Sequence, residues 1–545
     1  MATTDESVDA WFGTDGQVSQ LRGRLFKAGC LGATVLTLFL VFVFLVYVAI
    51  DAIEPLSADP GWWVTVVVLV PVPALVLAGY YYRYDPAAGE VAYTSLGLPI
   101  ATTLLAGGVV IFFRHILSPH EWLALVAATG IAVGLTELYG RVRDTDSYDR
   151  TLIAAVVFVV SIVGVPGAIP SLRTLILSLP VLPTESLSLV GTFAVPIAAV
   201  AGWHIGRVRE SDRAGLLASG ATVAMAALGI VAGPLVGIGA MAWIVLTAIV
   251  VVPIGLYVEQ VIRRGNGISG LAFPVVIGAG VLGSALLADI VGLAGPTVWL
   301  DWSFLTEVHD TTPREAGIYP ALVGSVMMVI VIAVAAFPVG VGAAIYLEEY
   351  APNGGLLGKV VELIEINIAN LAGVPSVVYG LLGLALFVKI GGLQPGIVVV
   401  GGLTIGLLIL PIIIVSSQEA IQAVPDSQRQ AAYGMGATRW QTVRTVVLPR
   451  AMPGILTGTI LALGRAIGET APLLMVGVAA VVRIPPRSFF GLFSAMPRQL
   501  YAWAQLAKPE FYHGVLAAGV LTLLVVLLMM NGTAILLRNK YQRRD

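Results

Sequence analysis

The sequence predicts an all-α protein that crosses a lipid bilayer many times. Of its 545 residues, 58% are hydrophobic and only 11% are charged, whereas a soluble domain carries about 25% charged residues. The mean hydropathy of +0.92 leaves too little polar surface to face water. These values exclude a soluble enzyme, a disordered segment and a nucleic-acid-binding protein, and the formal net charge of −2 offers no excess of cations for a nucleic acid.

The number of spans follows from the lengths of the apolar runs. A membrane-spanning helix needs about 20 consecutive apolar residues, and roughly fourteen stretches of the chain meet that length. We expect a miscount first at two pairs of neighbouring runs, 95–115 with 121–140 and 214–233 with 236–258, because the turns between them are short. The stretches are residues 28–50, 62–82, 95–115, 121–140, 151–170, 187–206, 214–233, 236–258, 269–293, 318–346, 371–389, 396–418, 452–480 and 512–537.

The first stretch begins like a secretory signal, because Arg22, Arg24 and Lys27 precede it. It then continues for about 23 residues without a charge, which is enough to cross a membrane. Its end, Ala49–Asp51, lacks the small residues of a cleavage site. We therefore predict an anchor that is retained.

Basic residues in the loops predict the orientation, because loops on the cytoplasmic side carry an excess of Lys and Arg. With the N-terminus in the cytoplasm, alternating spans place about 21 basic residues inside and about 8 outside. We therefore predict a plasma-membrane protein with both termini in the cytoplasm. The basic residues expected outside are Arg114, Arg173, Arg314, Lys389, Arg483, Arg487, Arg498 and Lys508.

The chain divides into two halves at the basic turn near residue 265. Residues 1–265 contain about eight predicted spans with short loops, and residues 266–545 contain about six. The second half has a large inside loop, residues 419–451, and long outside loops over 294–317 and 481–511.

The inside loop is polar although it lies between two apolar spans. Asp426 or Ser427 is its candidate N-cap, and a short helix is predicted over 427–435 until Gly436 ends it. Two short helices on the inner face would form a docking surface for a soluble partner. The alternative is a loop that lies on the lipid surface.

A second short helix is predicted over 438–447. Its residues Trp440, Val443 and Val447 have the spacing of one helix face, and Leu448-Pro449 is expected to end it.

Two opposite charges stand four residues apart in the next apolar run, Arg465 and Glu469. This spacing places them on one helix face, and charges inside a membrane usually face a cavity or a partner. In the functional interpretation Arg465 meets a passing anion, while Glu469 positions it or repels competitors. In the structural interpretation the pair only fixes helix packing.

A break is predicted in the apolar run around Gly373, Pro375 and Ser376. A broken helix in a bilayer is tolerated where it is packed in protein or lines a cavity, so freed amides and the Ser376 hydroxyl could contact an oxyanion. A simple proline kink is the alternative. An amphipathic helix on the inner surface is predicted over 356–370, and the preceding Glu348 and Glu349 are expected to form a solvated cap.

The inside loop resembles the EAA loop of ABC importer permeases. That motif has Glu-Ala-Ala, three residues, Gly, nine residues and then Ile-x-Leu-Pro. The matching positions are Gln430 in place of the glutamate, then Ala431, Ala432 and Gly436, then Val446 in place of the isoleucine, and Leu448 and Pro449. The resemblance implies a coupling helix that enters a cleft of an ATPase subunit, and Gln430 removes any salt bridge from that position.

Four further segments resemble the phosphate-specific branch of these permeases. They lie at 318–325, 341–352, 370–387 and 455–474, the last containing Arg465, Glu469 and Thr470. The run that begins at Asn370 and the ending after Asn531 favour the A-type over the C-type subunit. The resemblance covers roughly residues 266–545, implies a type-1 permease domain there, and leaves residues 1–265 without an assigned role.

The resemblance implies a transport subunit of a phosphate importer rather than an enzyme. No phosphate-binding Gly-x-x-x-x-Gly-Lys-Ser/Thr loop occurs, and the run from Gly354 to Lys359 has the wrong spacing. ATP would therefore be used by a dimer of ATPase subunits, with a C-type permease and an external phosphate-binding protein as further partners. An outside turn with Arg114, His115, His120 and Glu121 is a candidate contact for that binding protein.

Two other functions stay open. One is a permease for another oxyanion, such as molybdate or sulfate. The other is a secondary transporter or ion-coupled subunit, which would need an acid or histidine relay that the first half does not offer. No cofactor and no metal site is expected, because there is one cysteine and the five histidines have no partner at ligand spacing.

Overall fold

The computed structural model describes residues 20–142, 147–165, 169–178, 185–352 and 354–542. These residues form helices joined by turns, and within these ranges the only extended pairings are two isolated bridges, Val165 with Ile169 and Ile397 with Leu492. The all-α prediction is confirmed. Arg143, Arg543 and Arg544, which the orientation prediction counts as inside, lie outside the described residues.

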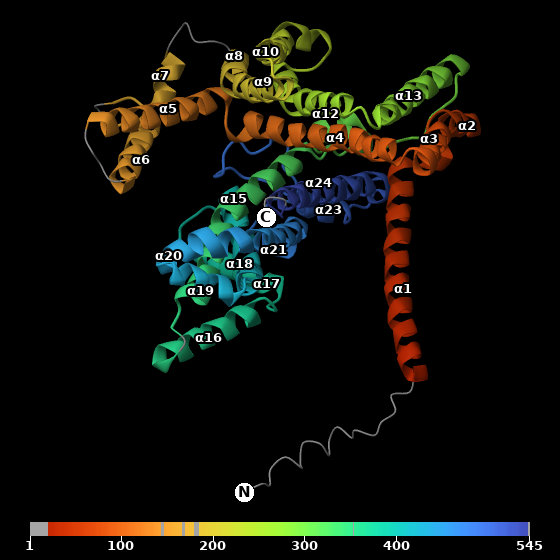
Figure 1. Ribbon diagram of the computed structural model, residues 1–545. Coiled ribbons are helices and arrows are strands. Elements are labelled where there is room, and N and C mark those ends of the chain that lie inside the picture. The colour runs from red at the N-terminus through yellow and green to blue at the C-terminus, as the bar shows by residue number, and fades with distance from the viewer. Residues whose placement is uncertain (1–19, 143–146, 166–168, 179–184, 353, 543–545) are drawn as a thin grey trace.

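Helices α1 to α12 form the first half, and α13 begins the second. Their bounds are α1 (Gln20–Ile53), α2 (Pro60–Leu69), α3 (Pro71–Tyr84), α4 (Pro86–Ile111), α5 (Pro119–Val142), α6 (Ser147–Val163), α7 (Leu172–Ser178), α8 (Glu185–Leu189), α9 (Val195–Arg209), α10 (Asp212–Leu235), α11 (Ala240–Leu246), α12 (Val252–Arg264) and α13 (Ala272–Val291). Figure 1 shows α1 standing apart from the other helices of the first half, and its contacts are with α24 at the other end of the chain.

The second half contains the remaining helices. Their bounds are α14 (Trp302–Thr306), α15 (Tyr319–Ile345), α16 (Gly355–Leu371), α17 (Ser376–Gly383), α18 (Val398–Gln422), α19 (Asp426–Gly434), α20 (Arg439–Thr442), α21 (Leu448–Gly468), α22 (Ala471–Met475), α23 (Met496–Trp503) and α24 (Leu516–Gln542). Helix α13 packs against α2, α3 and α4 of the first half.

The described residues contain 12 helices that are long and apolar enough to cross a membrane, or 13 when a bent pair counts as one span. This is one or two fewer than the roughly fourteen predicted, and the two pairs with short turns are not the cause, since each is two separate helices. The stretch 151–170 fails because α6 ends at Val163 and Gly164 takes a φ of +74°. The stretch 371–389 is one arm of the pair formed by 355–371 and 376–390, which is bent by 109°.

The segment from α6 to α7 nevertheless runs back along α5. A Cβ atom on Gly140, near the end of α5, would lie 3.1 Å from Arg150 Cζ at the start of α6. Arg173 of α7 pairs with Glu121 at the beginning of α5, with 2.9 Å between Nη2 and Oε1. Arg150 of α6 and Arg173 of α7 thus lie beside opposite ends of α5.

Helix α15 defines the two ends of the second half. From Tyr319 to Glu349 its backbone, including the π turn Tyr346–Tyr350, is about 45 Å long. We call the end at Glu349, where the 419–451 loop lies, the coupling face, and the end at Tyr319 the far face. In the first half Arg209 pairs with Glu259, and Asp59 accepts a hydrogen bond from the Ala294 amide.

The core of the protein lies in the second half, where α15, α18 and α21 pack on one another. Met327, Ile332, Ile405, Ile409 and Ile455 are fully buried there. In the apolar stretch of α18, 67% of the residues are buried, whereas in the apolar stretch of α1 only 6% are buried. Helix α18 is therefore the centre of a packed bundle, whereas α1 exposes its apolar side chains as a lipid-facing helix does.

Candidate functional site: coupling loop and anion pathway

The coupling loop forms two short helices separated by a glycine turn. Helix α19 begins at Asp426 with Pro425 in the cap position, so the predicted N-cap at Asp426 or Ser427 is wrong. The predicted turn at Gly436 is confirmed, because this residue adopts a φ of +83°, which favours glycine. Thr438 then caps α20 reciprocally with Gln441, at 2.8 and 3.3 Å.

The second helix of the loop does not end at Leu448-Pro449 as predicted. Helix α20, the π turn Val443–Val447 and α21 form one apolar helix from Arg439 to Gly468. Pro449 lies inside this continuous helix, directly after the π turn and Leu448, and bends or irregular turns are typical where a helix contains proline. The predicted common face is also wrong, because Trp440 is 57% exposed whereas Val443 and Val447 are buried; the π turn interrupts the α-helical spacing between the loop and the core.

A buried ion pair ties the loop to the end of α15. The Arg429 Nε donates to Glu349 Oε1 at 3.1 Å, and the two side chains are only 15% and 6% exposed. Arg429 also donates to Asp426 Oδ1 at 3.0 Å and to the Ile421 carbonyl at 2.9 Å. The guanidinium therefore fastens the start of α19 to α15.

We expected Glu348 and Glu349 to form a solvated cap. This is wrong for Glu349, which is buried and paired with Arg429. Its neighbour Glu348 accepts hydrogen bonds from the side-chain amides of Gln418 and Gln422, at 3.0 and 2.8 Å. Both acids are thus engaged by α18 and the loop that follows it. Sequence reasoning missed this contact because 80 residues separate Arg429 from Glu349.

The loop presents a mixed apolar and polar surface. Met435, Trp440 and Tyr433 are 84%, 57% and 42% exposed. Of the motif positions, Gln430, Ala431, Gly436 and Pro449 are exposed, Leu448 is half-buried and Ala432 is buried. Exposed aromatic and Met side chains beside polar groups are typical of a protein contact.

Arg465 and Glu469 pair at the end of α21, with 3.3 Å between Arg465 Nε and Glu469 Oε1. The pair does not lie within one continuous helix, because α21 ends at Gly468 and Glu469 is in extended conformation. Arg465 is 51% exposed and Glu469 is 17% exposed. The guanidinium therefore keeps an open side toward a ligand while one edge faces its carboxylate.

Ser376 and Thr470 lie at the starts of two helices that pack on each other. Ser376 is the first residue of α17, directly after Pro375 and the predicted break, and Thr470 precedes α22. The two helices meet at Gly380, where an added Cβ atom would lie 2.9 Å from Pro472 Cα. Both hydroxyl-bearing residues are half-buried, and in the described part of the chain neither hydroxyl has a hydrogen-bond partner.

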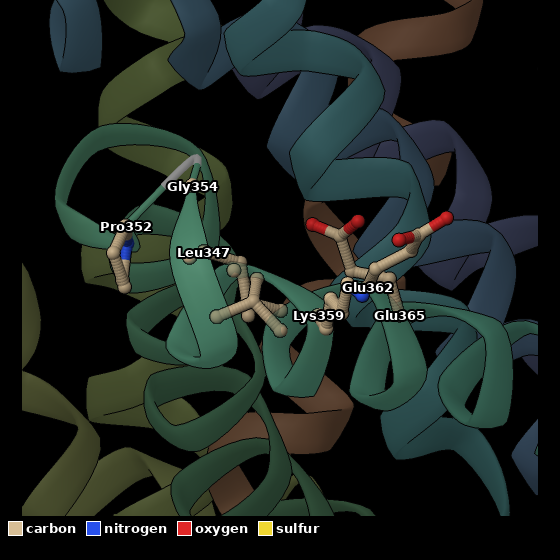
Figure 2. A pocket seen from close by; sticks show the side chains of 9 residues that line it. Leu347, Pro352, Gly354, Lys359, Glu362 and Glu365 are labelled. Atoms are coloured by element: carbon tan, nitrogen blue, oxygen red, sulfur yellow. The ribbon is translucent and has the colours of Figure 1, made fainter.

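An open hollow of about 440 Å³ lies on the coupling face between the end of α15 and the start of α16. Figure 2 shows the Glu362 and Glu365 side chains rising from the same side of α16, with Lys359 beside them. Gly354 and Gly355 form the opposite rim. Two carboxylates repel an anion, so this hollow is unsuited to phosphate despite its glycines and lysine.

Comparison with known proteins agrees with this geometry. Residues 340–540 match the family model described as the binding-protein-dependent transport system inner membrane component. The phosphate transport system permease protein PstA 1 of Mycobacterium tuberculosis is 32% identical over 268 residues, covering 46% of this chain and 84% of that protein. PstA of Mycobacterium leprae is 35% identical over 214 residues, covering 39% of this chain and 67% of that protein.

Among solved structures, a chain of the inward-facing MetNI methionine ABC transporter is similar. It is 15% identical with a TM-score of 0.33, covering 40% of this chain and 93% of that one. The family match lies over α15 to α24, where the coupling loop and the Arg465 pair are found. The chain therefore belongs to the binding-protein-dependent transport system inner membrane components and is a PstA-like type-1 ABC permease.

Proposed function

We propose that this protein is the membrane subunit of an ATP-driven importer of inorganic phosphate. The observation that carries the proposal is the coupling loop, held to α15 by the buried Arg429–Glu349 pair and continuous with α21. Its exposed aromatic surface suits a separate ATPase subunit. The relatives whose names include phosphate transport supply the choice of anion.

The loop supplies a route for force from the ATPase to the membrane helices. A displacement of α19 acts on α15 through Arg429, and a displacement of α20 acts on α21 through unbroken helix. These two helices and α18 form the packed core, so ATP binding and hydrolysis in a dimer of partner subunits would rock the core as a unit. A C-type permease would complete the pathway, and an external binding protein would deliver phosphate.

Arg465, Glu469, Thr470 and Ser376 are the proposed contacts of the passing anion. The exposed edge of the Arg465 guanidinium offers charge-assisted hydrogen bonds. The Ser376 and Thr470 hydroxyls add neutral donors from α17 and the start of α22. Glu469 holds the guanidinium in place and lowers the affinity for the anion, which favours release.

We assign the coupling face to the cytoplasm. Arg429, Arg439, Arg444 and Arg450 lie in the 419–451 loop on this face. An excess of cations on cytoplasmic loops is the general rule. Both termini then lie in the cytoplasm of a plasma-membrane protein.

Uptake of radiolabelled phosphate into proteoliposomes holding the complete transporter tests the proposal. Wild type should accumulate phosphate only with ATP, and Arg465→Ala should reduce the rate at least tenfold, whereas Arg465→Lys should retain part of it. Uptake by Arg465→Ala at the wild-type rate, or uptake without ATP, contradicts the proposal. Stronger competition by sulfate or molybdate than by unlabelled phosphate would assign another oxyanion.

A further inference from the structure

The first half contributes side chains to the far-face end of α15. Helix α4 ends in the π turn Phe112–Ile116, and Ile111 and Ile116 pack against the core of the second half. Within this turn, His115 Nε2 lies 2.6 Å from the Tyr319 hydroxyl, across 204 residues of sequence. The turn singled out from the sequence therefore meets the Tyr319 end of α15.

Two arginines lie near the contact between His115 and Tyr319, one from each half. The Arg114 guanidinium lies 6.0 Å from the centre of the Tyr319 ring. Arg487, from the loop before α23, lies close enough for its charge to act on the His115 ring. The far-face end of α15 thus has two cations near the His115 ring.

Neither arginine is neutralised by a carboxylate. Arg114 and Arg487 are both exposed, and among the described residues no acid forms an ion pair with either of them within 4.0 Å. The nearest acid in the same turn, Glu121, is already paired with Arg173 at 2.9 Å and bonded to the Ser118 amide at 3.0 Å. The charge of this cluster therefore stays positive.

The local backbone fits a binding role. A π turn inserts an extra residue into a helix, redirects the side chains that follow and is frequent at functional sites. Here it places Arg114 and His115 on the end of α15, about 45 Å from the coupling loop. With its proton on Nε2, His115 donates to Tyr319 and leaves the phenol O–H free to donate to a ligand.

We propose that Arg114, Arg487 and Tyr319 form an outer oxyanion site that captures inorganic phosphate at the far face, built across the two halves. This inference rests on the proposed function and adds a second site before the Arg465 pair. Two guanidinium groups balance the charge of a phosphate dianion and match its oxygens with paired donors. The first half would then supply one of the two cations and the histidine that orients Tyr319.

Equilibrium dialysis with radiolabelled phosphate tests the site on the complete transporter in lipid nanodiscs, without the binding protein. The Arg465→Gln background removes the inner site, so that binding reports the outer one. Arg114→Gln and Arg487→Gln should each raise the Kd at least fivefold, and Arg114→Lys less. The matched control is Arg173→Gln, a same-face arginine whose charge Glu121 already balances; its Kd should stay unchanged.

Three results would overturn the site. The first is an unchanged Kd in both Arg114→Gln and Arg487→Gln. The second is an equal effect of Arg173→Gln, which would indicate general surface charge. The third is an uptake defect of Arg114→Gln that extra binding protein restores while dialysis is unchanged, which would assign the cluster to protein docking. The uptake assay and the dialysis assay test different claims. If the wild-type transporter does not import phosphate, the proposed function is refuted, whereas the dialysis result alone decides whether the outer site exists.

Discussion

Removing the Glu349 carboxylate should uncouple the ATPase from transport. In Glu349→Ala, Arg429 loses its buried partner but keeps Asp426 and two backbone carbonyls. Breaking a buried ion pair on one side costs about 3–5 kcal/mol. Because Arg429 is 15% exposed and keeps these other acceptors, we expect the lower end, about 3 kcal/mol, which is roughly a hundredfold shift toward an undocked loop.

Hydrogen–deuterium exchange of the α19 amides measures this shift directly. Their protection should fall about a hundredfold, since opening of the loop is a local event. In proteoliposomes, phosphate uptake should fall at least tenfold while the complex stays assembled and ATP hydrolysis continues. The matched control is Glu348→Ala, which removes only bonds from neutral amides and should cost about 1 kcal/mol. Wild-type protection and wild-type uptake in Glu349→Ala would refute the proposed link between the loop and α15.

Three further changes have defined outcomes. Gly436→Ala forces a Cβ into a φ of +83° and should destabilise the loop by about 1–2 kcal/mol, measured as lower ATPase stimulation, with Gly434→Ala as a neutral control. Gly380→Val should separate α17 from α22, because even a Cβ would lie 2.7 Å from a side chain of α22; uptake should fall, and unchanged uptake would refute the contact. Burial and the charge of Arg483 lower the pKa of His309 below 6.5, so the stability that its neutral form gives is present above pH 6.5 and lost as pH falls. Acidification should therefore break the Trp503 indole bond to His309 Nδ1 and change tryptophan fluorescence, and His309→Gln should remove that transition.

The fold could be predicted largely from apolar length, because a bilayer demands about 20 apolar residues for each span. Apolarity alone does not show where a helix stops: it missed the end of α6 within 151–170, whereas glycine and proline predicted the break before Ser376. Gly164 ends α6 with a positive φ, and the break before Ser376 turns the chain by 109°. Neither geometry changes the hydropathy of the run.

The candidate site could be predicted only where the signal is local. Gly436 was sufficient to predict two short helices in the loop, and the spacing of Arg465 and Glu469 was sufficient to predict their pair. The contacts Arg429–Glu349 and His115–Tyr319 join residues 80 and 204 positions apart. The sequence around Arg429 or His115 does not indicate which residue of α15 it contacts. Both contacts become visible only in the folded structure.

Cross-linking at Trp440 tests the central claim, that this loop transmits force from a cytoplasmic ATPase. Cys30, the single cysteine, is replaced by Ala, and Trp440→Cys supplies a unique thiol in the exposed part of the loop. We predict that a membrane-impermeant thiol reagent labels this position only in inverted vesicles, and that a short cross-linker traps it on the ATPase subunit. Labelling from the outside of intact cells, or a complete transporter that never yields the cross-link, would contradict the claim.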